Sequence, residues 1–436
     1  MAGQSRKWMI LVATIWIQAF TGTNFDFSAY SSEMKAVLGV SQVQLNYLAT
    51  ASDLGKAVGG SSGLALMWLP LWAVMFTAAV MGLVGYGVQW LVISNVIALP
   101  YFVVFLLCLL AGCSICWFNT VCFVLCIKNF PSNRPLALSL TVSFNGVSAA
   151  LYNLAANSLN LSTSAVYLLL NALVPLFTSI AALVPIVRQP PVDGPDPDVD
   201  RLVMLGQEHT AKMLGHSLDF WLYYLAYFSG GTIGLVYSNN IGQIAQSLGH
   251  SLMNSKLITV YSAFSFFGRL LSAAPDFIRA KVYFARTGWL TIALLPTPIA
   301  FFVLVAFGGN PLAIQAGTAL IGLSSGFIFA AAVSITSELF GPESAGVNHN
   351  ILITNIPIGS LIYGFLAALV YDSNAVSGVG LLANSVVCMG RKCYFWTFVW
   401  WGCISLLGLA SSVLLFIRTR PAYHRFEQSR TSTMLY

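Results

Sequence analysis

Two charged residues stand inside a long apolar stretch, and their types and spacing make them the first candidates for chemistry. Asp53 and Lys56 lie near the middle of the run 42–66. An isolated charge at the centre of a membrane costs about 2.5 to 3.5 kcal/mol on insertion scales, so such residues usually face a polar interior. Their i, i+3 spacing places both on one helix face. They form either a neutralised packing pair, or a proton-coupling carboxylate at Asp53 beside an anion-attracting ammonium at Lys56.

Side-chain amides inside other apolar runs are the second group of candidates. Unpaired amides in hydrocarbon are costly, so each must bond to a neighbouring helix or line a wet cavity. Interhelical hydrogen bonding is the favoured interpretation, and a solute-lining role is the alternative for the group at 238–243. Pro357, close to Gly359, predicts a broken helix with freed carbonyls. The amide candidates are Asn119, Asn145, Asn239, Asn240, Gln243 and Asn355.

Composition places these residues in a membrane. Only 8% of the 436 residues are charged and 57% are hydrophobic, so a water-facing surface of ordinary polarity cannot form. Crossing the hydrocarbon layer takes about 20 apolar residues, and about twelve runs of that length predict helices rather than a β-barrel. We expect the first run to be a span and not a signal peptide, because it continues beyond a typical h-region. The expected spans are 8–28, 42–66, 71–93, 99–127, 136–158, 165–187, 218–241, 257–274, 282–307, 313–336, 351–371 and 394–417.

The longest polar interruption divides six spans from six, and its prolines and carboxylates at 190–198 prevent it from folding alone. We therefore expect an all-α polytopic membrane protein with two six-helix bundles, at 1–188 and 218–418. A cytoplasmic linker at 189–217 and a cytoplasmic tail at 419–436 complete the expected organisation. This is the outline of a two-bundle transporter whose solute site lies between the halves near the midplane.

The basic residues predict the orientation of the chain. With the amino terminus inside, 15 of the 20 Lys and Arg residues fall on the cytoplasmic side and four on the opposite side. This bias predicts that both termini are cytoplasmic. The net charge of +6 therefore reflects topology, and we expect no nucleic-acid partner.

The cysteines predict one disulfide and no metal site. Cys388 and Cys393 bracket a short basic segment in a non-cytoplasmic loop, where oxidation is permitted. Cys113 and Cys116 have CxxC spacing, but no second pair or nearby His supports a metal. No hydrolase, nucleotide-binding or metalloprotease motif is present, so we expect neither an enzyme nor a cofactor.

Several strings together resemble plant nodulin-like proteins, the group that includes the nuclear-fusion-defective-type proteins of the major facilitator superfamily. The resemblance covers nearly the whole chain and implies the major facilitator fold without defining a solute. Members of this family commonly have more sequence before the string LGQEH at 205–209, so the chain is expected to be a shortened form. The matching strings are FSAYSS (27–32), SQVQLN (41–46), DLGK (53–56), GYG (85–87), WFNT (117–120), NFP (129–131), GLVYSNN (234–240), SELFG (337–341) and RTRP (418–421).

The segment after the eighth run resembles the Gly, Asp and basic motif that major facilitator transporters carry between paired helices. The resemblance implies a cytoplasmic latch between the halves, whereas an ordinary positive-inside loop is the alternative. The gate candidates are Gly268, Arg269, Asp276 and Arg279.

We therefore expect a secondary active transporter of a small polar solute, with organic anions as a candidate class, that works by alternating access and couples to protons through Asp53. The alternative is a transport-inactive receptor or scaffold on the same fold. The expected partners are the solute, protons and the lipid bilayer. We expect a monomer in the plasma membrane or in an endomembrane such as the vacuole.

Overall fold

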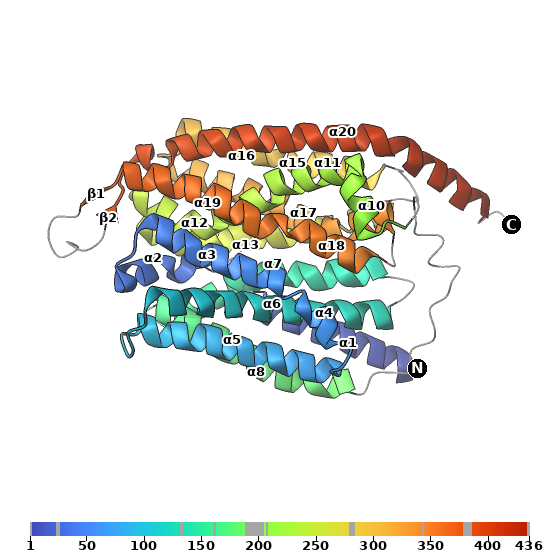
Figure 1. Ribbon diagram of the computed structural model, residues 1–436, viewed down its shortest axis with the longest axis horizontal. Coiled ribbons are helices and arrows are strands. Elements are labelled where there is room, and N and C mark those ends of the chain that lie inside the picture. The colour runs from blue at the N-terminus through green and yellow to red at the C-terminus, as the bar shows by residue number, and fades with distance from the viewer. Residues whose placement is uncertain are drawn as a thin grey trace.

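The computed structural model describes residues 2–22, 27–130, 134–159, 163–187, 205, 208–278, 284–341, 344–377 and 386–433. Long helices lie side by side along the long axis of the molecule (Figure 1). The start of the first helix and the end of the last lie at one end, which we call the terminus side. Two short antiparallel strands, β1 (Val376–Ser377) and β2 (Val386–Val387), mark the opposite end, which we call the hairpin side.

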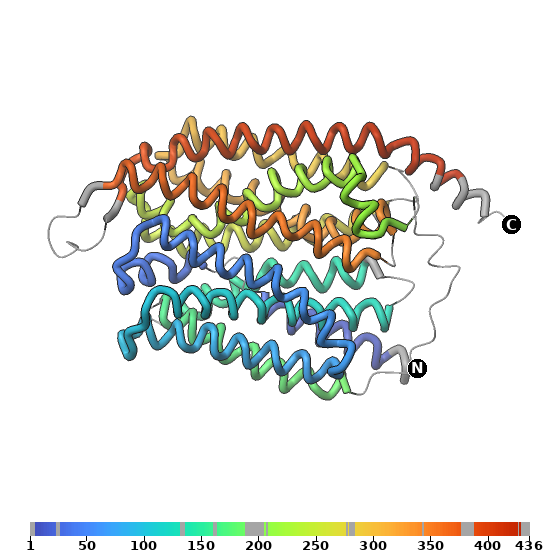
Figure 2. Tube along the Cα trace, in the orientation of Figure 1, coloured from blue at the N-terminus to red at the C-terminus, as the bar shows by residue number. Residues whose placement is uncertain are grey.

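The helices before the linker form one group, called here the N-half, and those after it form the C-half; the two groups lie side by side (Figure 2). The N-half contains α1 (Ala2–Thr21), α2 (Phe27–Leu38), α3 (Gln42–Val58), α4 (Ser61–Ala65), α5 (Leu71–Ile93), α6 (Tyr101–Asn129), α7 (Arg134–Ser158) and α8 (Thr163–Val187). The C-half contains α10 (Ala211–His216), α11 (Leu218–Tyr227), η3 (Phe228–Thr232), α12 (Ile233–Ser247), η4 (Ser251–Met253), α13 (Asn254–Leu271), α14 (Ala274–Ile278), α15 (Arg286–Leu294), α16 (Pro296–Phe307), α17 (Pro311–Phe340), α18 (Ala345–Ile353), α19 (Asn355–Ser373), η5 (Arg391–Cys393) and α20 (Phe395–Thr433).

The predicted twelve crossings in two six-helix bundles are confirmed, with corrections at several ends. The first predicted span, 8–28, is wrong at its end, because α1 stops at Thr21 and a second helix, α2, follows. Hydropathy missed α2 because this helix carries Ser28, Ser31 and Lys35, all buried in the folded chain. The last predicted span, 394–417, is too short, since α20 continues to Thr433.

Two crossings of the C-half are interrupted. A π-helical turn, η3, separates α11 from α12, and a break at Thr354 separates α18 from α19. The second break has a direct cause, because Pro357 has no N–H to donate to the carbonyl of Ile353 four residues earlier. The prediction of a broken helix near Pro357 is therefore confirmed.

Polarity separates the interface between the halves from the lipid-facing exterior. Within the described residues, seven crossings are long and apolar enough to span a membrane, judged by length and composition. The remaining five contain α1 with α2, α3, α7, α11 with α12, and α13. Most helices that make the main contacts between the halves come from this set: α7 packs on α13 and α2 on α12, and α3 packs on α19, which belongs to one of the seven apolar crossings. In contrast, α8 turns Phe177, Ile180 and Val184 outward, each more than half exposed. Apolar side chains cover the outside, and polar ones gather between the halves.

Glycines bring α3 and α6 into close contact. A Cβ atom at Gly55 would overlap the carbonyl oxygen of Leu109, and one at Gly112 would overlap the carbonyl oxygen of Ser52. At each glycine the backbone of the other helix therefore occupies the space that a side chain would fill. This close contact fixes the position and rotation of α3 in the N-half.

Gly55→Ala is expected to destabilise the protein by about 1 to 3 kcal/mol, because the added methyl group has no space and overpacking has this cost. Melting temperature in detergent measures the effect. Gly63→Ala is the matched control, since no atom lies within 4 Å of a Cβ at Gly63. Equal melting temperatures for the two variants would contradict the close-packing argument.

Candidate functional site

One face of α3 carries a stripe of polar residues toward the C-half. Ser41 and Gln44 start the helix with a capping box. From there Gln42, Asn46, Thr50 and Asp53 recur at intervals of four, four and three residues, which places them on one helix face. The Asn46 amide donates to the Gly364 carbonyl at 2.7 Å, and the Thr50 hydroxyl lies 3.5 Å from the Ser360 hydroxyl. The stripe therefore faces α19.

Asp53 is the charged centre of this interface. Its side chain is 1% exposed, and its Oδ1 accepts from the Lys56 ammonium at 2.7 Å. Its other oxygen, Oδ2, lies 3.4 Å from the Asn239 amide nitrogen on α12 of the C-half. The Lys56 side chain is 13% exposed, more than that of Asp53. One carboxylate thus connects a neighbouring cation with an amide of the opposite half.

The broken helix of the C-half lies level with this pair. Asn46 faces Gly364, Thr50 faces Ser360, and Gly60 lies beside Asn350. The chain therefore runs in opposite directions along α3 and along α18 and α19. Moving a given number of residues toward the C-terminus of α3 corresponds to moving the same number toward the N-terminus of α19 and α18. By this register, Lys56 lies opposite the break at Thr354.

Asn355, the first residue after the break, is fully buried. Its Oδ1 accepts from the Thr232 hydroxyl of η3 at 2.6 Å. Its Nδ2 is buried without a hydrogen-bond partner among the described residues. The two irregular turns of the C-half, η3 and the Thr354 break, are thus joined by one hydrogen bond.

The hairpin side closes through a second polar contact between the halves. Asp372, in the last turn of α19, accepts from the backbone N–H groups of Gln42 and Val43, each at 3.3 Å. These groups open α3, so the carboxylate also interacts favourably with the positive end of the helix dipole. Lys35 of α2 donates to the Gln42 side chain at 3.0 Å and lies 4.7 Å from the ring centre of Tyr371.

Gln243, another predicted candidate, also joins the halves on this side. Its amide donates to the Ser31 hydroxyl of α2 at 3.0 Å. Asn239 and Gln243 are therefore the amide candidates that reach the N-half from α12.

Other amide candidates bond within one half. Asn119 and Asn145 meet around Gln18 of α1: Gln18 donates to Asn119 at 2.9 Å, and Asn145 donates to Gln18 at 2.9 Å. Asn240 faces the C-half interior, where the Tyr394 hydroxyl lies 3.4 Å from its Oδ1. For these three residues the geometry is that of interhelical hydrogen bonding.

Two of the four gate candidates can be placed. Gly268 packs α13 against α17, since a Cβ there would overlap the Leu323 carbonyl. Arg269, assigned by sequence to a cytoplasmic segment, is instead buried in the last turn of α13. It donates to the Val142 carbonyl of the N-half at 3.3 Å, so it does connect the halves. The Asp276 side chain and Arg279 lie outside the described residues.

Cys388 and Cys393 form a disulfide on the hairpin side, and both residues are fully buried. The described part of the chain contains no group of three or more His, Cys, Asp or Glu residues able to hold a metal ion. The arrangement at Asp53 can accept a proton, hold a cation and donate hydrogen bonds.

Sequence reasoning missed several residues that complete the interface. The sequence could have indicated Gln42, Asn46 and Thr50, because their spacing places them on the same helical face as Asp53. It could also have indicated Gln18, since this residue is an amide inside the predicted span 8–28, whereas Asp372 lies just beyond the predicted span 351–371 and acquires its role only through packing.

The fold is that of a major facilitator transporter. The solved structure of a bacterial homologue of the human lysosomal transporter Spinster, inward-facing and unoccupied, matches with a TM-score of 0.64 and 12% identity. The match covers 97% of this chain and 98% of that chain. The protein is therefore a multi-pass integral membrane protein with the two-bundle transporter architecture.

The chain belongs to the nodulin-like family. The family model described as Nodulin-like matches residues 7–204, and the model described as NFD4, C-terminal domain, matches residues 204–425. Protein NUCLEAR FUSION DEFECTIVE 4 of Arabidopsis thaliana is 54% identical, with 99% of this chain and 92% of that protein covered. The alignment runs over 537 positions, more than the 436 residues here, so that protein has segments without a counterpart in this chain. Probable transporter MCH1 of Yarrowia lipolytica is 29% identical over 45% of this chain and 41% of that protein.

Lys56→Met is expected to destabilise the protein by about 3 to 5 kcal/mol, because it leaves the buried Asp53 carboxylate without its cation. Asp53→Asn should cost less, since the Lys56 side chain is 13% exposed and that of Asp53 only 1%. The double variant Asp53→Asn with Lys56→Met should recover most of the loss. Equilibrium unfolding in detergent measures all three, and equal losses for both single variants would contradict this account.

Proposed function

We propose that the protein is a secondary active transporter of a small polar solute that works by alternating access of the N-half and the C-half. The observation that carries the proposal is the Asp53 carboxylate, which is buried between the halves and reaches Lys56 and Asn239. A buried charge between two moving bundles is costly unless it serves a pathway or a coupling step. The moving units proposed are 1–188 and 218–418, joined by the linker 189–217, with a tail at 419–436.

Protonation of Asp53 provides the coupling step. The neutral acid attracts the Lys56 ammonium less strongly and is a weaker acceptor for the Asn239 amide. The contact between the halves at this level then weakens, and the Lys56 ammonium becomes available to an anionic group. Small organic anions are therefore the proposed solute class, carried together with protons.

The gate candidates and the orientation belong to the same proposal. Gly268, Arg269, Asp276 and Arg279 form the proposed latch of the terminus side, which we propose to be cytoplasmic. Asp372 and Gln243 close the hairpin side by contacts to α3 and α2. The protein acts as a monomer, without catalytic activity, in the plasma membrane or a vacuole-type endomembrane.

A transport-inactive receptor or scaffold on the same fold is the second candidate. It is favoured by the close packing around Asp53, Asn239 and Asn355, which are each at least 96% buried. A reconstituted protein that moves no solute from a broad panel, yet retains a specific binding partner, would support this alternative over transport.

Asp53→Asn is expected to remove the pH-gradient dependence of solute uptake into proteoliposomes, because the amide cannot take up the coupled proton. A panel of small organic anions and neutral polar solutes identifies the cargo in the unaltered protein first. Asp219→Asn is the matched control, since Asp219 forms a half-exposed pair with Arg418 on the terminus side. Undiminished gradient dependence in Asp53→Asn would remove Asp53 from the coupling step.

Asn46→Cys combined with Gly364→Cys is expected to form a disulfide that stops transport. A Cβ at Gly364 lies 3.7 Å from the Asn46 Cβ, within the range of about 3.5 to 4.5 Å found in disulfides. The bond would hold α3 against α19 and prevent the halves from separating. Uptake before and after a reducing agent measures the effect, and each single cysteine variant serves as a control. Normal uptake by fully cross-linked protein would rule out movement at this contact.

A further inference from the structure

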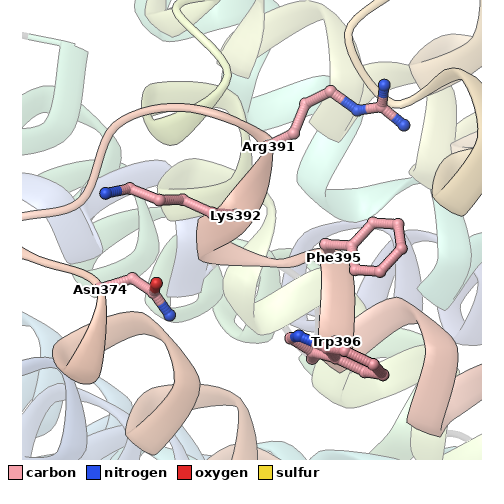
Figure 3. A pocket seen from close by; sticks show the side chains of 5 residues that line it. All are labelled: Asn374, Arg391, Lys392, Phe395 and Trp396. Carbon is pink, nitrogen blue, oxygen red and sulfur yellow. The ribbon is translucent and has the colours of Figure 1, made fainter.

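A pocket of about 380 Å³ lies on the hairpin side and is lined by residues of the C-half. Its lining residues are Asn374, Arg391, Lys392, Phe395 and Trp396 (Figure 3). Two of these five are cationic, two are aromatic and none is acidic. This combination fits an anionic group attached to an apolar body, which is the chemistry of a phospholipid rather than of a small soluble anion.

The cationic turn is held in place by the protein. The disulfide between Cys388 and Cys393 closes the loop around it. Arg391 donates to the carbonyls of Val305 and Ala306 at the end of α16, at 2.7 and 3.1 Å. The Gly390 N–H donates to the Ser247 carbonyl at 2.7 Å. The turn is therefore anchored on both α12 and α16, and its two charges are presented from a fixed position.

Lys392 supplies the more available of the two charges. It is exposed and makes no ion pair with any residue of the described chain. Figure 3 shows Lys392 and Arg391 projecting from opposite sides of the turn, with the rings of Phe395 and Trp396 on the following turn of α20.

The position relative to the membrane argues for a lipid. Trp396 and Trp400, one helical turn apart on α20, are 58% and 61% exposed. They stand where this membrane-spanning helix begins, the depth at which Trp is enriched at the boundary between headgroups and acyl chains. Basic side chains at that depth attract anionic lipid headgroups. We propose that this pocket binds the phosphate headgroup of an anionic phospholipid from the leaflet on the hairpin side, with Trp396 against its apolar part.

Native mass spectrometry of the full-length protein in detergent, titrated with phosphatidylglycerol or phosphatidylcholine, tests the proposal. Lys392→Gln should reduce phosphatidylglycerol binding about fivefold, which corresponds to about 1 kcal/mol for one basic residue near an anionic surface. Binding of phosphatidylcholine should change little. Lys256→Gln is the matched control, because Lys256 is an exposed lysine on the same side at the start of α13. It should leave both lipids unaffected.

Two results would overturn the proposal. An equal loss in Lys392→Gln and Lys256→Gln would assign the binding to general surface charge. Displacement of the lipid by millimolar glycerol 3-phosphate would show that the pocket takes a soluble phosphate instead. Trp396→Ala provides a second measurement, since it should weaken lipid binding but not the binding of a headgroup without acyl chains.

Discussion

A carboxylate inside an apolar helical bundle must be neutralised, and the centre of this protein is arranged around that requirement. Asp53 has a cation one helical turn away and an amide from the opposite half. Transfer of an unpaired charge into such an interior costs several kcal/mol, which packing of neighbouring side chains cannot offset. The pair therefore has to stay together whenever Asp53 is ionised.

The distribution of polarity explains how the halves can be embedded in a membrane and still meet through hydrogen bonds. Lipid surrounds the outer helices, which expose leucine, phenylalanine and tryptophan side chains. Between the halves lie short hydrogen bonds such as that from Asn46 to Gly364. Hydrogen bonds of this kind are worth about 1 kcal/mol each in membrane proteins. Together they specify one alignment of the halves.

The two interruptions of the C-half stand beside this interface. The π-helical turn η3 and the break before Asn355 leave backbone groups outside the regular helical pattern. The hydrogen bond from Thr232 to Asn355 connects η3 with the start of α19. Such breaks are tolerated in a membrane only where protein or a polar cavity covers the freed groups. Most residues of η3 and Asn355 are buried, whereas Thr354 at the second break is exposed.

Sequence alone predicted the membrane location and the twelve crossings and singled out Asp53 and Lys56 as candidates, because hydrophobic length and charge within an apolar run are local properties of the chain. It also predicted the break near Pro357, which follows from a missing backbone N–H. Only the tertiary structure decided which amides meet: Asn239 and Gln243 reach the other half, whereas Asn119 and Asn145 pair with Gln18. The helix α2 and the role of Asp372 were likewise invisible, since a buried polar residue is favourable only when a distant segment supplies its partner.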